Sequence, residues 1–322
     1  MGQLDLFGAA PSRGVGPAPQ ADDVVALGRR LPSDVRLGTS SWSFPGWRGL
    51  VYDRDATPAR LARAGLRAYA AHPLFRTVGL DRTFYAPMTP AAFGDLAAQV
   101  PATFRFVVKA LETATVAVFP RHARYGPQAG EPNPRFLDPD PVVAELVRPA
   151  LAGLGAALGP IVFQLPPQPP AHLGGPARFA MRLRAFLRGL PSGPTYAVEL
   201  RNRELAGADV ARVLADCGAV PCLTVHPTMP PVDVQAEALV TSAGPLVVRW
   251  MLGAGQEYEA ARERYAPFDR LVDPDPGTRA AIVALVRGAR RAGHAAWVVV
   301  NNKAEGSAPA SVVELARELA AS

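Results

Sequence analysis

The chain is poor in cysteine and has no long apolar run. Cys217 and Cys222 are the only cysteines in 322 residues, which excludes a disulfide framework and favours a protein of the reducing cytoplasm. Both thiols fall in or near expected secondary structure and are predicted to be packing residues. No apolar run approaches the ~20 residues that a membrane-spanning helix needs, and no basic region leads into an apolar stretch near Met1. We therefore expect neither a membrane protein nor a secretory signal.

Several motifs that carry chemistry are absent as well. The sequence has no GxGxxG dinucleotide fingerprint, no GxSxG nucleophile elbow, no HExxH zinc motif and no Walker sequence. His226 is the only histidine expected at a strand end, and a zinc site needs several converging ligands. No metal site is therefore predicted, although a single Mg²⁺ on Asp81 and Glu199 is compatible with the sequence. The sequence identifies no cofactor.

Lysine is scarce: Lys109 and Lys303 are the only two among 34 lysine and arginine side chains. The net charge is +6 and the pI is about 9.7, which permits an anionic partner such as a nucleic acid. Arginine in place of lysine, together with much alanine and proline, indicates a GC-rich coding genome. The basicity is therefore partly a compositional bias, and it carries less weight as a sign of nucleic-acid binding.

After about residue 33, short Val-rich runs alternate with helical patterns. Thr57 before Pro58 and Thr89 before Pro90 mark two helix starts. Eight strands alternating with helices predict parallel pairing and, over residues 34–322, a (β/α)8 TIM barrel, for which ~250 residues is typical. A doubly wound open sheet is the alternative. The expected strands span residues 35–42, 76–85, 103–111, 160–167, 195–202, 219–226, 245–252 and 294–302.

Barrel geometry turns these strand ends into a site prediction. The C-terminal ends of all strands in a TIM barrel meet at one mouth, where the active sites of such barrels lie. Polar and aromatic side chains at the strand ends are therefore expected to converge there. They are Trp42, Asp81, Lys109, Gln164, Glu199, Arg201, His226, Arg249, Asn301, Asn302 and Lys303.

Seven segments along the chain read, in order, GTSSWSFPGWRGLVY, TVGLDRTFY, FRFVVKA, FQLPPQ, YAVELRN, VVRWMLG and VVVNNKAEGSAP. Together they resemble the YecE-like family (domain of unknown function 72) over about residues 36–322. The resemblance implies a TIM barrel and leaves the activity open. The chain departs from the family pattern VEINSTFY at Gly79 and Asp81, which replace glutamate and asparagine, and from RLHG at Met251, which replaces histidine. Chemistry that uses this glutamate and histidine is in question here.

Glu199, Lys109 and Asp81 are the candidate catalytic residues. Glu199 lies in an expected buried strand, where it could be a general acid or base with a raised pKa. The alternative is a structural ion pair with Arg201 or Lys109. Lys109 stands in a chain that otherwise uses arginine, so a Schiff base, a phosphate contact or a charge partner for Glu199 could explain it, as could chance retention.

The other strand-end side chains are candidate ligand-binding residues. The basic ones are predicted to clamp an anion together with Lys109. The amides could orient a sugar, base or phosphate, or cap loop backbone, and the tryptophan could stack on a ring or form part of an aromatic lid. They are Arg201, Arg249, Gln164, Asn301, Asn302, Trp42 and His226.

Residues 1–33 are rich in Gly, Pro and Ala and are predicted to be a mostly disordered arm, apart from a short stretch that could form a helical turn. The arm carries QLDLF, which resembles the bacterial sliding-clamp-binding peptide. In that class the glutamine makes polar contacts and the leucines and phenylalanine fill an apolar cleft. Residues 8–33 would be the tether; a tail that packs on its own barrel is the alternative. The motif residues are Gln3, Leu4, Asp5, Leu6 and Phe7.

Three functions remain open from the sequence. The first is a cytoplasmic barrel protein, an enzyme or a binder, that acts on a phosphate-bearing or nucleic-acid ligand and is recruited to the sliding clamp. The second is a non-catalytic accessory protein of the clamp or of DNA. The third is a small-molecule enzyme in which QLDLF is incidental. Neither the reaction nor the oligomeric state can be read from the sequence.

Overall fold

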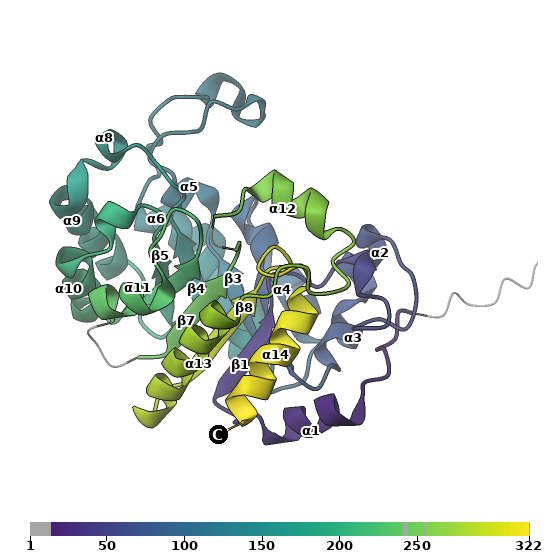
Figure 1. Cartoon of the computed structure of the whole chain (residues 1–322). Helices are drawn as coiled ribbons and strands as arrows, with labels where there is room; N and C mark the ends of the chain where they lie inside the picture. Colours follow the sequence, from purple (N-terminus) through teal and green to yellow (C-terminus); the bar gives the residue numbers. More distant parts are fainter. Residues whose placement is uncertain (1–13, 241–243, 254, 322) are drawn as a thin grey trace, which may run out of the picture.

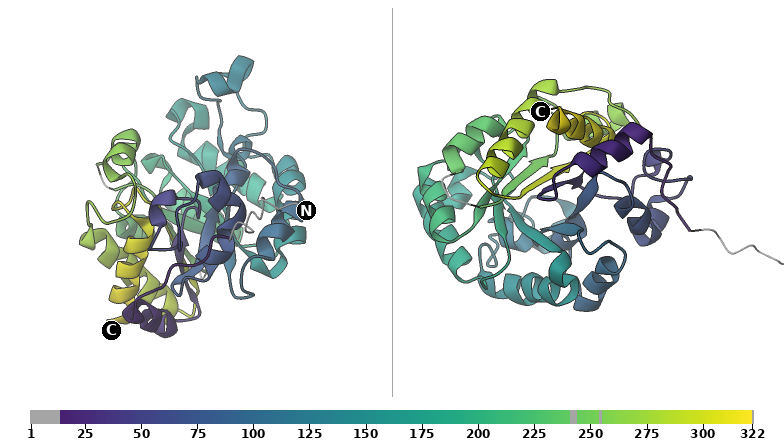
Figure 2. Two further views of the ribbon diagram at one scale, coloured as in Figure 1. Left: turned by 90° about the vertical axis from the view of Figure 1, so that its right-hand side faces the viewer. Right: turned by 90° about the horizontal axis from the view of Figure 1, so that it is seen from below.

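The computed structural model describes residues 14–240, 244–253 and 255–321. Eight parallel strands close into one barrel, in which each strand pairs with its neighbours in sequence and the last pairs with the first (Figure 2). This confirms the predicted TIM barrel. The strands are β1 (Val35–Thr39), β2 (Phe75–Leu80), β3 (Arg105–Lys109), β4 (Leu158–Gln164), β5 (Tyr196–Glu199), β6 (Val220–Val225), β7 (Leu246–Trp250) and β8 (Ala296–Val300).

Helices surround the barrel and connect the strands (Figure 1). The two predicted helix starts are observed: the Thr57 side chain accepts from Arg60 N at 3.3 Å and Thr89 from Ala92 N at 3.2 Å. The helices are α1 (Asp22–Arg30), α2 (Pro58–Ala64), α3 (Leu66–Ala70), α4 (Pro90–Ala97), α5 (Glu112–Thr115), α6 (Pro139–Val142), α7 (Arg148–Leu154), α8 (Pro170–Leu173), α9 (Gly175–Arg188), α10 (Ala208–Asp216), α11 (Val232–Leu239), α12 (Tyr258–Tyr265), α13 (Pro276–Arg291) and α14 (Ala308–Ala320).

Shorter helical turns lie in the connections. Those of the 3-10 type are η1 (Pro45–Trp47), η2 (Asp81–Phe84), η3 (Ala123–Gln128), η5 (Gly155–Ala157) and η6 (Arg203–Leu205), and η4 (Val143–Val147) is a π-helical turn between α6 and α7. In Figure 1 the mouth of the barrel faces upward, and the loop after β3 projects above it.

Alternation along the strands separates two cores. Side chains that point outward join the helices in one large apolar core, whereas a small cluster fills the inside of the barrel. The inner cluster contains Val107, Val162, Ala197, Cys222, Val247 and Val299. Cys222 is therefore a packing residue, as predicted. At Gly38 a Cβ atom would lie 1.9 Å from the Thr77 carbonyl oxygen, so the close approach of β1 and β2 requires glycine.

The N-terminal segment differs from its prediction. From Gly14 onward the chain packs on the barrel: Val15 is buried, α1 contacts α14, and Arg317 pairs with Asp23 at 2.8 Å. A few scattered apolar residues are sufficient for this packing, because they cover a core that the barrel already provides and do not have to form a core of their own. Residues 14–33 thus belong to the folded domain and are not a flexible tether, while QLDLF lies outside the described residues. None of the described helices is long and apolar enough to cross a membrane.

Candidate functional site at the barrel mouth

Polar side chains form the uppermost layer inside the barrel, directly above the apolar inner cluster. Lys109, Gln164, Glu199 and Arg249 lie two residues beyond the inward-facing Val107, Val162, Ala197 and Val247 on their strands, and so point into the barrel as well. Gln164 and Glu199 stand side by side in the register of β4 and β5. The parallel barrel therefore brings residues from four strands to one place.

Glu199 is at the centre of this layer and has no exposed surface. Arg201 Nε donates to its Oε1 at 2.9 Å, and Arg249 Nη1 donates to its Oε2. Arg249 also approaches Asp81, with 3.4 Å between Nη2 and Oδ1. Glu199 and Arg201 share a face, as expected for residues two apart in an extended segment. Arg249 thus bridges the two carboxylates of the site.

The pKa of Glu199 follows from these contacts. Burial alone would raise it, but Arg249 and Arg201 outweigh burial and hold the pKa at about 2. The same pairing raises the pKa of Arg249. The pKa is thus lowered, where a general acid or base would need a raised one, and both carboxylate oxygens are occupied. In this arrangement Glu199 holds the two guanidinium groups in place, and its catalytic role stays a prediction.

Lys109 is in a different situation. It is half-buried, and its Nζ lies 3.6 Å above the centre of the Phe84 ring. Burial lowers the pKa of Lys109 to about 8, with Asp81 and Glu199 acting against the shift and Arg249 and Arg201 adding to it. Among the described residues no carboxylate lies within ion-pair distance of Nζ. Lys109 is thus an amine that the protein leaves unpaired.

The charges of the site do not cancel. Three cations, Lys109, Arg201 and Arg249, face two carboxylates, Asp81 and Glu199. The difference is one positive charge when Lys109 is protonated. Arg201 uses Nε for Glu199, and 15% of its side chain is exposed, so the site is open to solvent at Arg201. The mouth is therefore electropositive around Arg201 and Lys109.

The amides and the tryptophan have different roles. Asn301 borders the mouth, where its Nδ2 donates to Ser40 Oγ at 2.9 Å. The side chain of Asn302 points away from the mouth and accepts from Trp47 Nε1 at 3.2 Å and from the Ala308 backbone at 2.9 Å. Trp42 is buried and donates to the Leu61 carbonyl at 3.1 Å. Asn302 and Trp42 thus make structural contacts, and ligand binding by either of them stays a prediction.

His226 supports the neighbouring loop. Its Nδ1 lies 2.9 Å from Thr228 Oγ1, which donates to the Arg201 carbonyl at 2.9 Å. Burial and, less strongly, Arg201 lower the pKa of His226 to about 4, so the ring is neutral at pH 7. His226 therefore positions the backbone of Arg201.

A magnesium ion on Asp81 and Glu199 fits the arrangement poorly. Arg249 binds both carboxylates, and a divalent cation would have to displace its guanidinium group. In the part of the chain that the structure describes, no three His, Cys, Asp or Glu side chains are grouped so that they could hold a metal.

The space around position 79 is related to the two departures from the family pattern at Gly79 and Asp81. A Cβ atom at Gly79 would lie 3.0 Å from the Ser40 carbonyl oxygen, so a glutamate there would require β1 to shift. In this chain the carboxylate that meets Arg249 comes from Asp81 instead. A cavity of about 340 Å³ lies beside it and is lined in part by Ser40, Trp42 and Arg82.

Three aromatic residues near the mouth were missed in the sequence analysis. Phe84 contacts Lys109, and Tyr85 and Tyr258 are 71% and 58% exposed at the rim. Lys303 Nζ lies 4.2 Å from the centre of the Tyr258 ring. The segment TFY after β2 is the one signal that could have pointed to Phe84 and Tyr85, because it begins two residues after Asp81.

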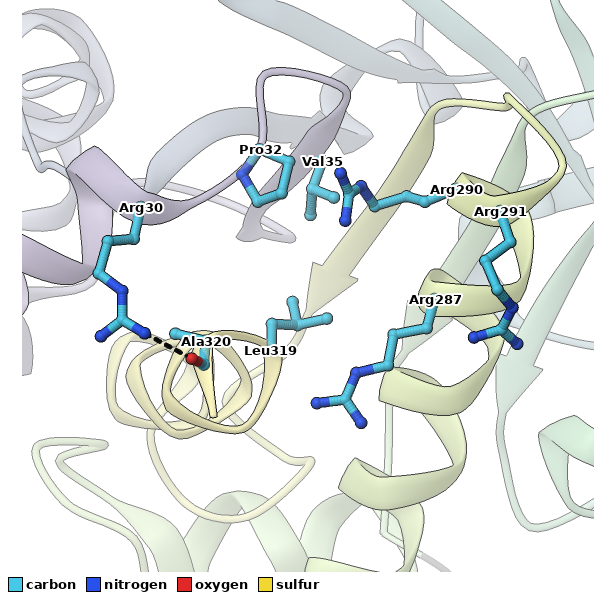
Figure 3. A pocket seen from close by; sticks show the side chains of 8 residues that line it. All are labelled: Arg30, Pro32, Val35, Arg287, Arg290, Arg291, Leu319 and Ala320. Atoms are coloured by element: carbon cyan, nitrogen blue, oxygen red, sulfur yellow. Dashed lines mark hydrogen bonds between the residues drawn. The ribbon is translucent and has the colours of Figure 1, made fainter. Parts of the chain in front are cut away.

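A larger cavity, of about 610 Å³, lies at the opposite end of the barrel (Figure 3). Arg30 there donates to the Ala320 carbonyl at 2.6 Å, and Arg290 pairs with Asp34 at 3.2 Å. Guanidinium groups are favourable at the C-terminal ends of α13 and α14, where the helix dipole is negative. These contacts explain the arginines around the cavity as structural residues, and none of the residues that line the cavity is a nucleophile. Its arginines are Arg30, Arg287, Arg290 and Arg291.

Comparisons with known proteins agree with this fold. The family described as "Protein of unknown function DUF72" matches residues 36–322. A DUF72 family protein from Enterococcus faecalis is 16% identical, with a TM-score of 0.60 over 89% of this chain and 96% of that chain. One from Thermotoga maritima is 20% identical, with a TM-score of 0.60 over 88% and 98%. No curated protein matches the chain. At such identities the structural likeness supports the barrel alone.

Proposed function

The chain belongs to the DUF72 family, and from the charges at its barrel mouth we propose that it binds an anionic, phosphate-bearing ligand there. The observation that supports this most directly is the unbalanced positive charge of Lys109, Arg201 and Arg249 above a buried Glu199. An anionic group beside Arg201 and Lys109 would neutralise it. The ligand sites of TIM barrels lie at this end.

The fixed guanidinium groups favour binding. Glu199 holds Arg201 and Arg249 before any ligand arrives, so little side-chain entropy is lost when an anion binds. Arginine suits phosphate because two of its N–H groups can bind two oxygens at once. The layer is recessed inside the barrel, which favours a small ligand or a terminal phosphate over the side of a duplex.

Titration calorimetry with inorganic phosphate, a mononucleotide and a 5′-phosphorylated single strand tests this. We expect binding that weakens between 50 and 200 mM salt, and a loss of about tenfold or more in Lys109→Met, because one of three cations is removed. Arg212→Met, which removes an exposed charge on α10, is the matched control. Equal affinity of Lys109→Met and Arg212→Met would rule out the site. Preference for the single strand would favour a DNA role over a small-molecule role.

We further propose that QLDLF recruits the protein to the sliding clamp in a bacterial cytoplasm. The support is the match of all five motif residues, Gln3 to Phe7. Fully burying each apolar anchor gains ~1.5–3 kcal/mol and ordering each backbone residue costs ~1–2 kcal/mol, so the two terms largely offset each other and the affinity should be weak.

A pulldown from bacterial lysate, with and without nuclease, tests the recruitment. Leu6→Ala combined with Phe7→Ala should abolish capture of the clamp and leave the Tm unchanged. A drop in Tm of several degrees would mean that the motif packs on its own barrel instead. Capture that nuclease removes would point to DNA rather than to the clamp.

A further inference from the structure

We propose that Lys109 is a nucleophilic amine that forms a Schiff base with an anionic aldehyde or ketone held in the mouth. This assignment rests on the proposed anion binding and names its substrate class, a carbonyl compound that carries a phosphate or carboxylate. The established features of the fold do not require a lysine at this place.

The geometry isolates the amine. Lys109 is the last residue of β3, and Thr83 Oγ1 fixes the strand end by donating to the Lys109 carbonyl at 2.6 Å. Nζ rests over the face of Phe84, which is itself buried. Arg201 and Arg249 are bound to Glu199, whereas in the described part of the chain Nζ has no carboxylate within ion-pair distance. The amine is thus held in place without being consumed by an ion pair.

The chemistry explains why this residue is lysine. A guanidinium group does not lose its proton near neutral pH, whereas an ammonium in a half-buried, cationic setting can. With a pKa of about 8, roughly one-tenth of the Lys109 amines are neutral at pH 7. Only two of 34 basic side chains are lysine, so arginine would be the expected residue if the position needed only charge.

The reaction balances without an oxidant or a reductant. Neutral Nζ attacks the carbonyl carbon, a C–N bond forms, the nitrogen loses one proton and the former carbonyl oxygen gains one, which gives a neutral carbinolamine. The hydroxyl group then takes up a second proton, the one that the ammonium released when it became neutral, and leaves as water while the nitrogen lone pair forms the C=N bond. Overall, an ammonium and a carbonyl compound give an iminium ion and water.

The neighbouring residues provide the remaining functions. The carboxylate of Asp81 lies beyond ion-pair distance of Nζ but acts on its charge, and it is 36% exposed, so protons can pass between it, Nζ and the departing oxygen through water. Arg201 holds the anionic group of the substrate. Glu199, with both oxygens engaged, acts only by positioning the arginines.

Reductive trapping tests the assignment on the full chain. The protein is incubated with glyceraldehyde 3-phosphate or with pyruvate in the presence of sodium cyanoborohydride, digested with trypsin and analysed by mass spectrometry. The two lysines fall on separate peptides, 106–121 and 292–317, so the modified residue is read directly. Lys303, whose Nζ lies 3.4 Å from Asn301 Oδ1, is the internal control.

With glyceraldehyde 3-phosphate, we expect the adduct at Lys109 to be at least tenfold more abundant than the adduct at Lys303. It should also be at least tenfold more abundant than the Lys109 adduct formed with unphosphorylated glyceraldehyde. Inorganic phosphate should compete with its formation. Trapping should increase with pH, with the midpoint of the rise near pH 8, since the pKa of Lys109 is about 8. Lys109→Arg should lose the adduct, because a guanidinium group does not form a Schiff base.

Failure of this proposal can be told apart from failure of anion binding. Salt-sensitive phosphate binding without an adduct at Lys109 would overturn the Schiff base and leave the ligand site standing. Equal labelling of both lysines, or labelling that phosphate does not reduce, would also overturn it.

Discussion

Replacing Arg249 with methionine should severely destabilise the barrel. The guanidinium group is 3% exposed and binds a carboxylate with no exposed surface. Its removal leaves Glu199 buried with Arg201 as the single remaining ion-pair partner, and breaking a buried pair from one side costs about 3–5 kcal/mol. Methionine has a similar length, so lost packing contributes little. We expect the cost at pH 7 to lie near the lower end of this range, because Arg201 still neutralises one oxygen.

The same variant should change the dependence of stability on pH. The pKa of Glu199 is about 2 in the folded protein against 4.5 ordinarily, so its contribution of about 3 kcal/mol is present above pH 4.5 and is lost as the pH falls toward 2. In Arg249→Met, burial raises the pKa and fewer cations oppose it. The loss of stability between pH 4.5 and 2 should therefore be smaller than in the unmodified protein, and it should become a gain if the folded pKa rises above 4.5.

Urea unfolding followed by tryptophan fluorescence, at pH 7 and in steps down to pH 3, measures both effects. The control is Arg262→Met, an exposed ion-pair partner of Glu259 on α12, which should cost less than about 0.5 kcal/mol. In a double-mutant cycle, Glu199→Gln should cost much less in the Arg249→Met background than alone. If Arg249→Met costs no more than Arg262→Met, the buried cluster does not behave as an ion-pair network and the reasoning is refuted.

Three further substitutions test other features. Lys109→Met should increase the free energy of unfolding at pH 7 by up to about 3 kcal/mol, because the folded pKa is near 8 rather than 10.5; the gain should shrink as the pH rises from 8 to 10.5, and a loss of stability would contradict it. Asn302→Ala should cost about 1–3 kcal/mol in urea unfolding, because Trp47 Nε1 loses its acceptor; no effect would mean that water replaces the amide. Gly38→Ala should lower the Tm sharply, at a cost of about 3 kcal/mol or more, because the new methyl would overlap a β2 carbonyl; an unchanged Tm would show that the strands can separate there.

The fold was predictable because its signal is repeated. Each Val-rich run can be ambiguous alone, but eight of them alternating with helices admit few architectures. The strand-end residues then meet at the mouth because a parallel barrel places every C-terminal end on one side. The order of strands and helices along the chain was therefore enough to predict that these residues meet.

The features that could not be predicted depend on the direction in which a side chain points and on contacts between residues far apart in the sequence. Asn301 and Asn302 are neighbours, but only Asn301 borders the mouth, because successive side chains point to opposite sides. Glu199 looked like an acid or base until Arg249, fifty residues away, was found on its second oxygen. Residues 14–33 lack the apolar content of a core, and only the finished barrel offers them a surface on which to pack.

The path of the N-terminal segment limits where a tethered partner can be. Gly16 donates to Asp53 Oδ1 at 3.0 Å and Ala18 to the Val51 carbonyl at 2.9 Å, so the described chain starts against the loop between β1 and α2. Seven Cα–Cα steps separate Phe7 from Gly14, which is a reach of at most about 25 Å. A partner held by QLDLF would therefore stay near the loop that begins at the mouth. An anionic group carried by such a partner would then meet the barrel at a millimolar effective concentration, so a mouth with weak intrinsic affinity for phosphate would still be occupied.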